Sequence, residues 1–155
     1  MLMSWIALAA SVIVAITVSF LCSLLESALL SLTPSQLAEI RERSVRRGEL
    51  CLKLKHEIEK SLAVILILNT AAHTIGAAVA GAEFAALFGN GWLGLFTLAF
   101  TLVMVQYTEI LPKTLGVHYN CRIMGMTARP LVVMSMLMSP LIALVHWINR
   151  PFEAK

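Results

Sequence analysis

The segment that decides the fold is Ser19-Phe20-Leu21-Cys22-Ser23-Leu24-Leu25-Glu26-Ser27, in which four polar residues interrupt a long apolar run. Positions 19, 23, 26 and 27 follow the spacing i, i+4, i+7, i+8, so in a helix their side chains share one face. The surrounding run from Trp5 to Leu25 supplies about 21 residues, enough to cross roughly 30 Å of hydrocarbon. Because hydroxyls and a carboxylate are unfavourable against lipid, this face must meet water or polar groups from other segments.

The composition places the chain in a membrane. Of its 155 residues 59% are hydrophobic and 14% are charged, and the mean hydropathy is +0.83. These values predict one all-α polytopic membrane domain over residues 1–155, surrounded by the lipid bilayer. The net charge of +3 does not indicate a nucleic-acid partner, because the basic residues flank apolar segments. The three cysteines form no CxxC pair, so neither a disulfide framework nor a zinc site is expected.

Three transmembrane helices are predicted, at about residues 4–32, 61–88 and 92–111. The short uncharged turn Gly89-Asn90-Gly91 joins the last two. The second span carries Ala72, Gly76 and Ala80 at the small-xxx-small spacing, which predicts close contact with another helix.

Juxtamembrane helices are predicted over residues 34–60 and 117–150. Thr33-Pro34-Ser35-Gln36 has the capping-box pattern that opens a helix, and the loop 33–60 carries the densest cluster of Lys and Arg. By the positive-inside rule this basic loop and the C-terminus are cytoplasmic and the N-terminus is outside. The expected location is therefore the cell membrane, plasma or inner, with several passes.

The apolar stretch 131–148 has Pro140 near its middle and basic residues on both flanks. A single span there would put one basic flank on the wrong side of the membrane. We therefore expect a kinked apolar helical hairpin or belt that dips into the cytoplasmic leaflet, with a fourth span as the alternative.

Polar residues recur in the second and third spans, in Asn69-Thr70-Ala71-Ala72-His73 and in Gln106-Tyr107-Thr108-Glu109-Ile110-Leu111-Pro112-Lys113. Counted from the cytoplasmic ends of their spans, Ser23 and Asn69 both lie roughly 12 to 14 Å deep at helical rise. Glu109 belongs to the same half of the membrane. The three side chains are therefore expected to meet at one height.

A carboxylate at membrane depth is unfavourable unless it is paired or faces water. We therefore interpret Glu109 as a functional residue, with a structural ion pair to Lys113 as the alternative. Pro112 is expected to break the helix, because it lacks an N–H and frees the carbonyl of Thr108. Unwound backbone from there to Gly116 would expose further carbonyl oxygens, as in the broken helices where transporters coordinate ions.

Three other polar residues have more than one interpretation. Asn69 is either a cation ligand or a hydrogen-bonding contact between helices. His73 is a ligand, a proton carrier or a buried histidine with satisfied hydrogen bonds. Glu26 is either a second acid of the site or a side chain that extends towards the basic loop. The serine hydroxyls of Ser19, Ser23 and Ser27 either face an ion or bond back to the preceding turn, and Thr70 and Thr108 are further candidates for the ion site.

Carboxylate, hydroxyl, amide and carbonyl oxygens are hard ligands that suit Mg²⁺, Ca²⁺ or Na⁺ better than zinc or copper. These residues alone do not separate the three ions. No enzyme motif is present: His56-Glu57 begins like HExxH, but the fifth position is Lys60, and there is no GxSxG, Walker loop or dinucleotide fingerprint. We expect a transporter rather than an enzyme.

Three motifs together resemble the transmembrane domain of the CNNM/CorC magnesium-transport family. They are Ser23-Leu24-Leu25-Glu26-Ser27-Ala28-Leu29, Ile67-Leu68-Asn69-Thr70-Ala71-Ala72-His73-Thr74-Ile75-Gly76 and Thr108-Glu109-Ile110-Leu111-Pro112-Lys113-Thr114. The resemblance implies a homodimer of three-span protomers with a juxtamembrane belt, which exports Mg²⁺, in some members in exchange for Na⁺. It also implies that a dehydrated magnesium ion is held by Ser23, Asn69, Glu109 and the backbone near Gly116.

Two departures from the family pattern are visible. Many members have a second asparagine where this chain has His73, which bears on the ligand count and the ion preference. The chain ends at Lys155, before the cytoplasmic CBS domains usual in the family, so no ATP site is expected within it.

The sequence thus predicts a transporter that binds and translocates Mg²⁺ through hard oxygen ligands. One rival hypothesis is a proton- or sodium-coupled antiporter in which Glu109, Glu26 and His73 form a relay. A second is a membrane scaffold that transports nothing and whose polar face joins helices.

Overall fold

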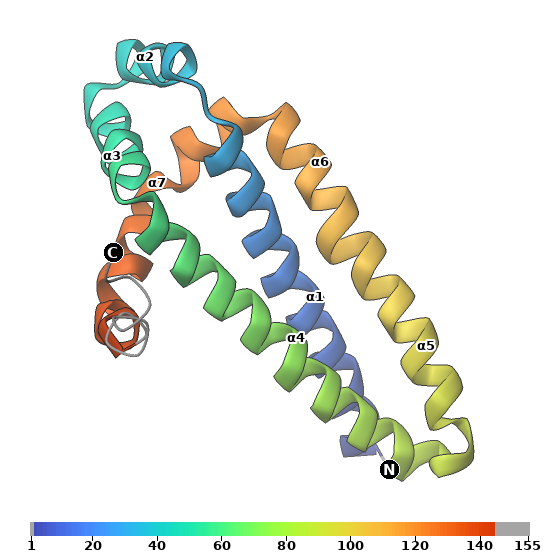
Figure 1. Cartoon of the computed structure of the whole chain (residues 1–155). Coiled ribbons are helices and arrows are strands. Elements are labelled where there is room, and N and C mark those ends of the chain that lie inside the picture. The colour runs from blue at the N-terminus through green and yellow to red at the C-terminus, as the bar shows by residue number, and fades with distance from the viewer. Residues whose placement is uncertain (1, 145–155) are drawn as a thin grey trace, which may run out of the picture.

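The computed structural model describes residues 2–144, and every regular element in that range is helical (Figure 1). The elements in chain order are α1 (Leu2–Ser31), α2 (Pro34–Arg43), α3 (Val45–His56), α4 (Ile58–Phe88), the 3-10 turn η1 (Asn90–Trp92), α5 (Leu93–Met104), the π-helix η2 (Val105–Ile110), α6 (Leu111–His118) and α7 (Asn120–Leu137). Three helical stretches are long and apolar enough to cross a membrane: Met3–Ser31, Ile58–Phe88 and Asn90–His118. The predicted all-α polytopic fold with three spans is confirmed.

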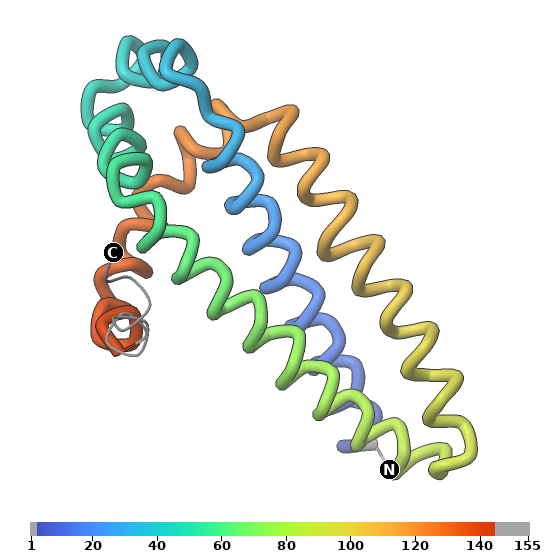
Figure 2. The backbone as a smooth tube through the Cα atoms, in the orientation of Figure 1, coloured from blue at the N-terminus to red at the C-terminus, as the bar shows by residue number. Residues whose placement is uncertain are grey.

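The first span is the central element of the fold. Helix α1 packs along α4 on one side and against η2 and α6 on the other (Figures 1 and 2). Gly76 of α4 provides the closest approach, because a Cβ added there would collide with the Cβ of Ala15. Ala80, one turn further along α4, is fully buried. The small-residue ridge is therefore a helix contact, as predicted, and its partner lies within the chain.

The third span is longer than predicted, and Pro112 does not break it. Helix continues from Leu93 to His118, with the π-helical segment Val105–Ile110 just before the proline. There the Leu111 N–H donates to the Gln106 carbonyl, five residues back. Pro112 has no N–H to donate to the preceding turn. Because the wider π-helical turn shifts the nearby hydrogen bonds to carbonyls five residues back, the helix continues through this region instead of unwinding. The prediction of unwound backbone between Thr108 and Gly116 is wrong.

Helices α2, α3 and α7 gather at the end of the bundle where α1 ends (Figure 1). The capping box at Thr33 is confirmed, with Gln36 as its partner, and the extended residue Ser44 divides the predicted 34–60 segment into α2 and α3. A buried apolar core joins these helices to the ends of α1 and α4, and it includes Leu29, Leu54, Ile65, Met124 and Leu131.

Two contacts tie this end together. The Cys51 thiol donates to the Met124 carbonyl at 3.6 Å, and burial raises the pKa of this thiol to about 11, so it remains a protonated donor at neutral pH. The Lys55 ammonium donates to the Leu29 carbonyl at 2.9 Å. Because α1 has no basic residue in its own last turn, Lys55 supplies the positive charge that a helix C-terminus favours.

The last predicted element is described only in part. Helix α7 begins at Asn120, passes through Pro130 and ends at Leu137, after which a turn at Met138 separates it from further helix over residues 139–144. This interruption lies next to Pro140, where we predicted a kink. Residues 145–148 of the predicted hairpin or belt lie outside the described residues.

Candidate cation site

Five side chains from three elements form one hydrogen-bonded group, which we call the polar cluster: Ser19, Asn69, His73, Thr108 and Glu109. Ser19 of α1 donates to the Asn69 Oδ1 atom at 2.6 Å, and the Asn69 Nδ2 atom donates to Glu109 Oε1 at 3.4 Å. His73 Nε2 contacts the hydroxyls of Ser19 and, at 3.1 Å, of Thr108. Segments far apart in the sequence therefore meet at one place.

The hydroxyl contacts bear on the tautomer of His73. The Ser19 hydroxyl donates to Asn69, and the Thr108 hydroxyl donates to the Met104 carbonyl at 2.7 Å. With both hydroxyl protons directed to these acceptors, a proton on His73 Nε2 is the arrangement that satisfies both of its contacts.

The members of the polar cluster lie at similar depth, but the first span contributes Ser19 to it where the sequence analysis placed Ser23. At 1.5 Å per residue, Ser19 is about 18 Å from the end of α1 at Ser31, and Asn69 is about 17 Å from the start of α4 at Ile58. Glu109 is about 14 Å from the end of the third span at His118. All three distances are measured from the end where α2 and α3 lie.

Lys113 lies beside the polar cluster, between two carboxylates. Its ammonium lies 2.9 Å from Glu109 Oε2 and 3.8 Å from Glu26 Oε2. The alternative that Glu109 pairs with Lys113 is therefore present in the structure, and Glu26 faces the same ammonium. The exposed fractions of the Glu109, Lys113 and Glu26 side chains are 30%, 46% and 32%, so this part of the site is open on one side.

Ser23 is the residue in this region with an unused oxygen. It is fully buried on the same face of α1 as Ser19, one turn away, and its Oγ atom has no hydrogen-bond partner within the described residues. A buried hydroxyl without a partner is costly, typically about 1 to 3 kcal/mol, and the orphan atom points to a ligand or water. It is the hydroxyl that the sequence singled out for a cation.

The remaining predicted site residues lie beside the polar cluster. Ser27 donates back to the Ser23 carbonyl at 2.9 Å, which matches the packing alternative, and Thr70 is exposed. Gly116 is buried in α6 against α1. A Cβ added at Gly116 would collide with the Ser27 hydroxyl and lie 2.6 Å from the Leu24 carbonyl. Because glycine has no Cβ, the third span can approach the first closely at Gly116.

We therefore expect Gly116→Ala to destabilise the protein by about 1 to 3 kcal/mol, because the added methyl group forces α6 away from α1. Thermal unfolding in detergent measures the change. Gly125→Ala is the matched control, since a Cβ at Gly125 meets nothing within 4 Å and alanine favours a helix. Equal melting temperatures for the two variants would contradict the tight α1–α6 contact.

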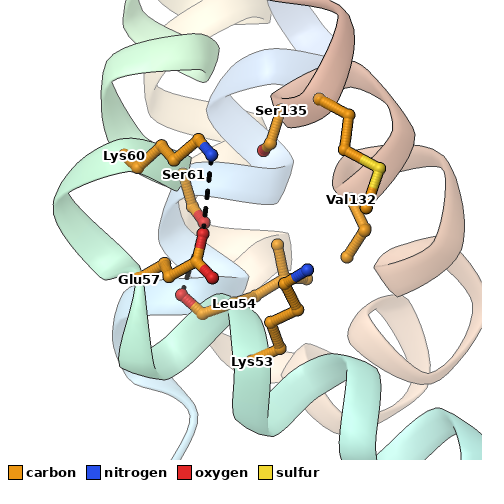
Figure 3. A pocket seen from close by; sticks show the side chains of 8 residues that line it. Lys53, Leu54, Glu57, Lys60, Ser61, Val132 and Ser135 are labelled. Atoms are coloured by element: carbon orange, nitrogen blue, oxygen red, sulfur yellow. Dashed lines mark hydrogen bonds and ion pairs between the residues drawn. The ribbon is translucent and has the colours of Figure 1, made fainter. Parts of the chain in front are cut away.

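A second orphan hydroxyl, Ser135 Oγ, lies away from this site. It lines a small cavity of about 20 Å³ between α3, α4 and α7, shown in Figure 3 with Glu57, Lys60 and Ser61. Ser61 already donates to the Leu54 carbonyl at 3.3 Å, and Lys60 pairs with Glu57 at 3.7 Å. The cavity has room for one water molecule and no more.

The structure also reveals a positioning residue that the sequence analysis missed. Asn120 is buried at the start of α7, and its Nδ2 atom donates to the Ser31 carbonyl at 3.1 Å and to Gln36 Oε1 at 3.1 Å. It thus fastens the end of the third span to the α1–α2 junction. The only signal in the sequence is a single asparagine inside the predicted juxtamembrane helix 117–150, which is too common to be informative.

The chemistry of the polar cluster is that of hard oxygens around one carboxylate. No group of three or more His, Cys, Asp or Glu side chains with metal-binding geometry occurs in the described range, so a soft-metal centre is not indicated there. Hydroxyl, amide and carboxylate oxygens are all present between α1, α4 and η2. They suit a small hard cation, provided that Lys113 releases Glu109.

Comparison with known proteins identifies relatives. Residues 10–153 match the family model described as the cyclin M transmembrane N-terminal domain. The UPF0053 protein sll1254 of Synechocystis is 26% identical over 92% of this chain and 41% of its own length. The UPF0053 inner membrane protein YfjD of Escherichia coli is 23% identical over 81% of this chain and 29% of its own length.

A plant protein is also similar. The chloroplastic DUF21 domain-containing protein At1g55930 of Arabidopsis thaliana is 24% identical over 82% of this chain, but only 19% of its own length is covered. The chain thus spans less than half the length of each of these relatives. What is similar is the membrane domain.

Proposed function

Because the chain belongs to the cyclin M transmembrane domain family, which is linked to metal-ion transport, we propose that it binds Mg²⁺ between the polar cluster and the neighbouring Ser23 and carries it across the cell membrane. The observation that supports this is the convergence of hard oxygens from α1, α4 and η2 at one depth. Efflux in exchange for Na⁺ is the proposed direction and coupling. The N-terminus would be outside, and the basic loop 33–60 cytoplasmic.

The proposed ligands are Glu109 for charge, with Ser23 and the oxygen of Asn69 replacing part of the water shell. The Ser23 hydroxyl is buried and has no hydrogen-bond partner among residues 2–144, and Asn69 already directs its amide group towards both Ser19 and Glu109. The backbone near Gly116 is the proposed fourth contributor, although its carbonyl belongs to a helical turn. Because Mg²⁺ requires near-octahedral oxygens at about 2.0 to 2.1 Å, these groups would have to move inwards to hold it.

Lys113 gives this proposal a mechanism for exchange. With its ammonium at 2.9 Å from Glu109, the carboxylate is neutralised when no metal is bound. An incoming cation would displace Lys113 towards Glu26, which lies 3.8 Å from the same nitrogen. The return of Lys113 to Glu109 would then assist release, so that the carboxylate stays compensated at membrane depth throughout the cycle.

We also propose that the chain functions as a homodimer. Glu109, Lys113 and Glu26 lie within spans, yet each side chain is about one-third to one-half exposed. Charged groups in a span avoid lipid, so a second copy or a water-filled vestibule must cover this side. A water-filled vestibule between two protomers would provide both the second copy and the water that cover these side chains.

Proton coupling is the second candidate. His73 and Glu109 are the two titratable members of the polar cluster and would carry the proton; since the Asn69 amide between them does not pass protons on, a relay would have to be completed by water. In that case the exchanged ion would be H⁺ rather than Na⁺. Imposing a pH gradient or a Na⁺ gradient across the vesicles separates the two forms of coupling.

Flux of Mg²⁺ in proteoliposomes tests the proposed function. We expect flux above that of protein-free vesicles for the unaltered chain and a loss of about tenfold or more for Asn69→Ala, since even groups that only orient a metal ligand are worth about 10- to 100-fold and Asn69 is a proposed ligand. Asn90→Ala, at the exposed turn η1, is the matched control and should keep full flux. Equal flux in both variants, or none above empty vesicles for the unaltered chain, would overturn the proposal.

A further inference from the structure

A basic pocket lies apart from the polar cluster, where α2 and α3 face the first turns of α7. Its volume is about 350 Å³, and three arginines and one carboxylate line it, with apolar side chains beside them. The residues that matter here are Arg43, Arg47, Arg122, Glu39, Ile40 and Met126. No part of the proposed transport cycle uses this pocket.

The positive charge of the pocket is only partly compensated. Arg43 Nη2 pairs with Glu39 Oε1 at 2.6 Å, within α2. Arg47 and Arg122, from α3 and α7, make no ion pair or side-chain hydrogen bond with any residue between 2 and 144. Two guanidinium groups from different helices thus face one cavity without an anion. Guanidinium groups bind phosphate oxygens in pairs, so the pocket has the chemistry of a phosphate site.

The position of the pocket indicates the source of the phosphate. Arg122 comes four residues after the end of the third span at His118, just past the turn at Tyr119, so it lies near the level where a membrane-crossing helix leaves the hydrocarbon. Met126, one turn further on, is 68% exposed, while Ile40 is buried beneath the pocket. An exposed apolar side chain beside free arginines at this level matches the boundary between phosphate headgroups and acyl chains.

We propose that this pocket binds the headgroup phosphate of an anionic phospholipid, with Arg47 and Arg122 as the phosphate ligands and Met126 against the glycerol and acyl region. The lipid would bridge α3 and α7 and so join the two juxtamembrane helices at the membrane surface. This site is independent of the proposed Mg²⁺ transport.

Native mass spectrometry of the detergent-solubilised chain tests the site, with phosphatidylglycerol and phosphatidylcholine as probes. We expect the unaltered chain to retain phosphatidylglycerol preferentially. The double variant Arg47→Gln/Arg122→Gln should bind it about 30-fold more weakly, as expected for two basic groups near a lipid phosphate. The control Arg46→Gln/Arg129→Gln removes the same charge from exposed positions of the same two helices outside the pocket and should lose less than about threefold.

A second variant tests the pocket without changing charge. A side chain at Gly125 would project into open space along the pocket, so Gly125→Leu should fill it and weaken phosphatidylglycerol binding as the arginine pair does. Equal losses in the pocket and control arginine pairs, or full binding in Gly125→Leu, would refute the site. Displacement of the lipid by inorganic phosphate alone would show a free-phosphate site and overturn the lipid assignment.

Discussion

Glu109→Gln is expected to reduce Mg²⁺ flux in proteoliposomes to the level of protein-free vesicles, a loss of at least about 100-fold. Glu109 is the single carboxylate hydrogen-bonded within the polar cluster, and a neutral amide cannot compensate a divalent cation that has lost its water. The variant should also lose the rise in melting temperature that Mg²⁺ gives the unaltered chain, because ligand binding stabilises only the folded state.

The fold should survive this change. Glutamine keeps the length of the side chain and a carbonyl that accepts from Asn69, and Lys113 retains Glu26 as an anionic neighbour. Glu57→Gln is the control, since it removes a carboxylate that also pairs with a lysine, Lys60 at 3.7 Å, but lies outside the polar cluster and the proposed exchange. If Glu109→Gln transports as fast as Glu57→Gln, Glu109 is not the charged ligand.

Lys113→Met should raise the apparent affinity for Mg²⁺ by about tenfold and slow turnover. In the structure the ammonium holds the Glu109 carboxylate at 2.9 Å, so it competes with any cation for the same oxygens. A hydrogen bond to a charged group is worth about 1.5 to 3 kcal/mol, and removing this competitor favours the bound ion by a comparable amount. The cost of leaving the Glu109 carboxylate uncompensated reduces this gain. Release would slow because no internal cation replaces the departing one.

The concentration dependence of Mg²⁺ flux separates these two effects, with a lower half-saturating concentration and a lower maximal rate expected together. Lys60→Met is the control, because Lys60 also pairs with a carboxylate, Glu57 at 3.7 Å, but outside the polar cluster. A weaker affinity in Lys113→Met would instead make Lys113 a positioning residue that holds Glu109 in place for the ion.

Periodicity and composition were enough to predict three spans, the capping box at Thr33 and the contact at Gly76, since each depends on local spacing or on transfer from water to lipid. The spacing of polar residues also indicated that the first, second and third spans meet. It did not indicate which hydroxyl would pair with Asn69. The structure pairs Asn69 with Ser19 and leaves Ser23, one turn away, without a partner in the part of the chain that it describes.

The sequence by itself therefore determined that this chain is an all-α membrane domain with an oxygen-rich face on each of three spans. Only the tertiary structure decided that Pro112 sits within a continuous helix behind a π-helical segment, and that Lys113 bridges Glu109 and Glu26. The physical reason is that helix periodicity assigns a side chain to a face, whereas its partner depends on the rotation and separation of neighbouring helices. Those are set by contacts such as Gly116 against Ser27, between residues far apart in the sequence.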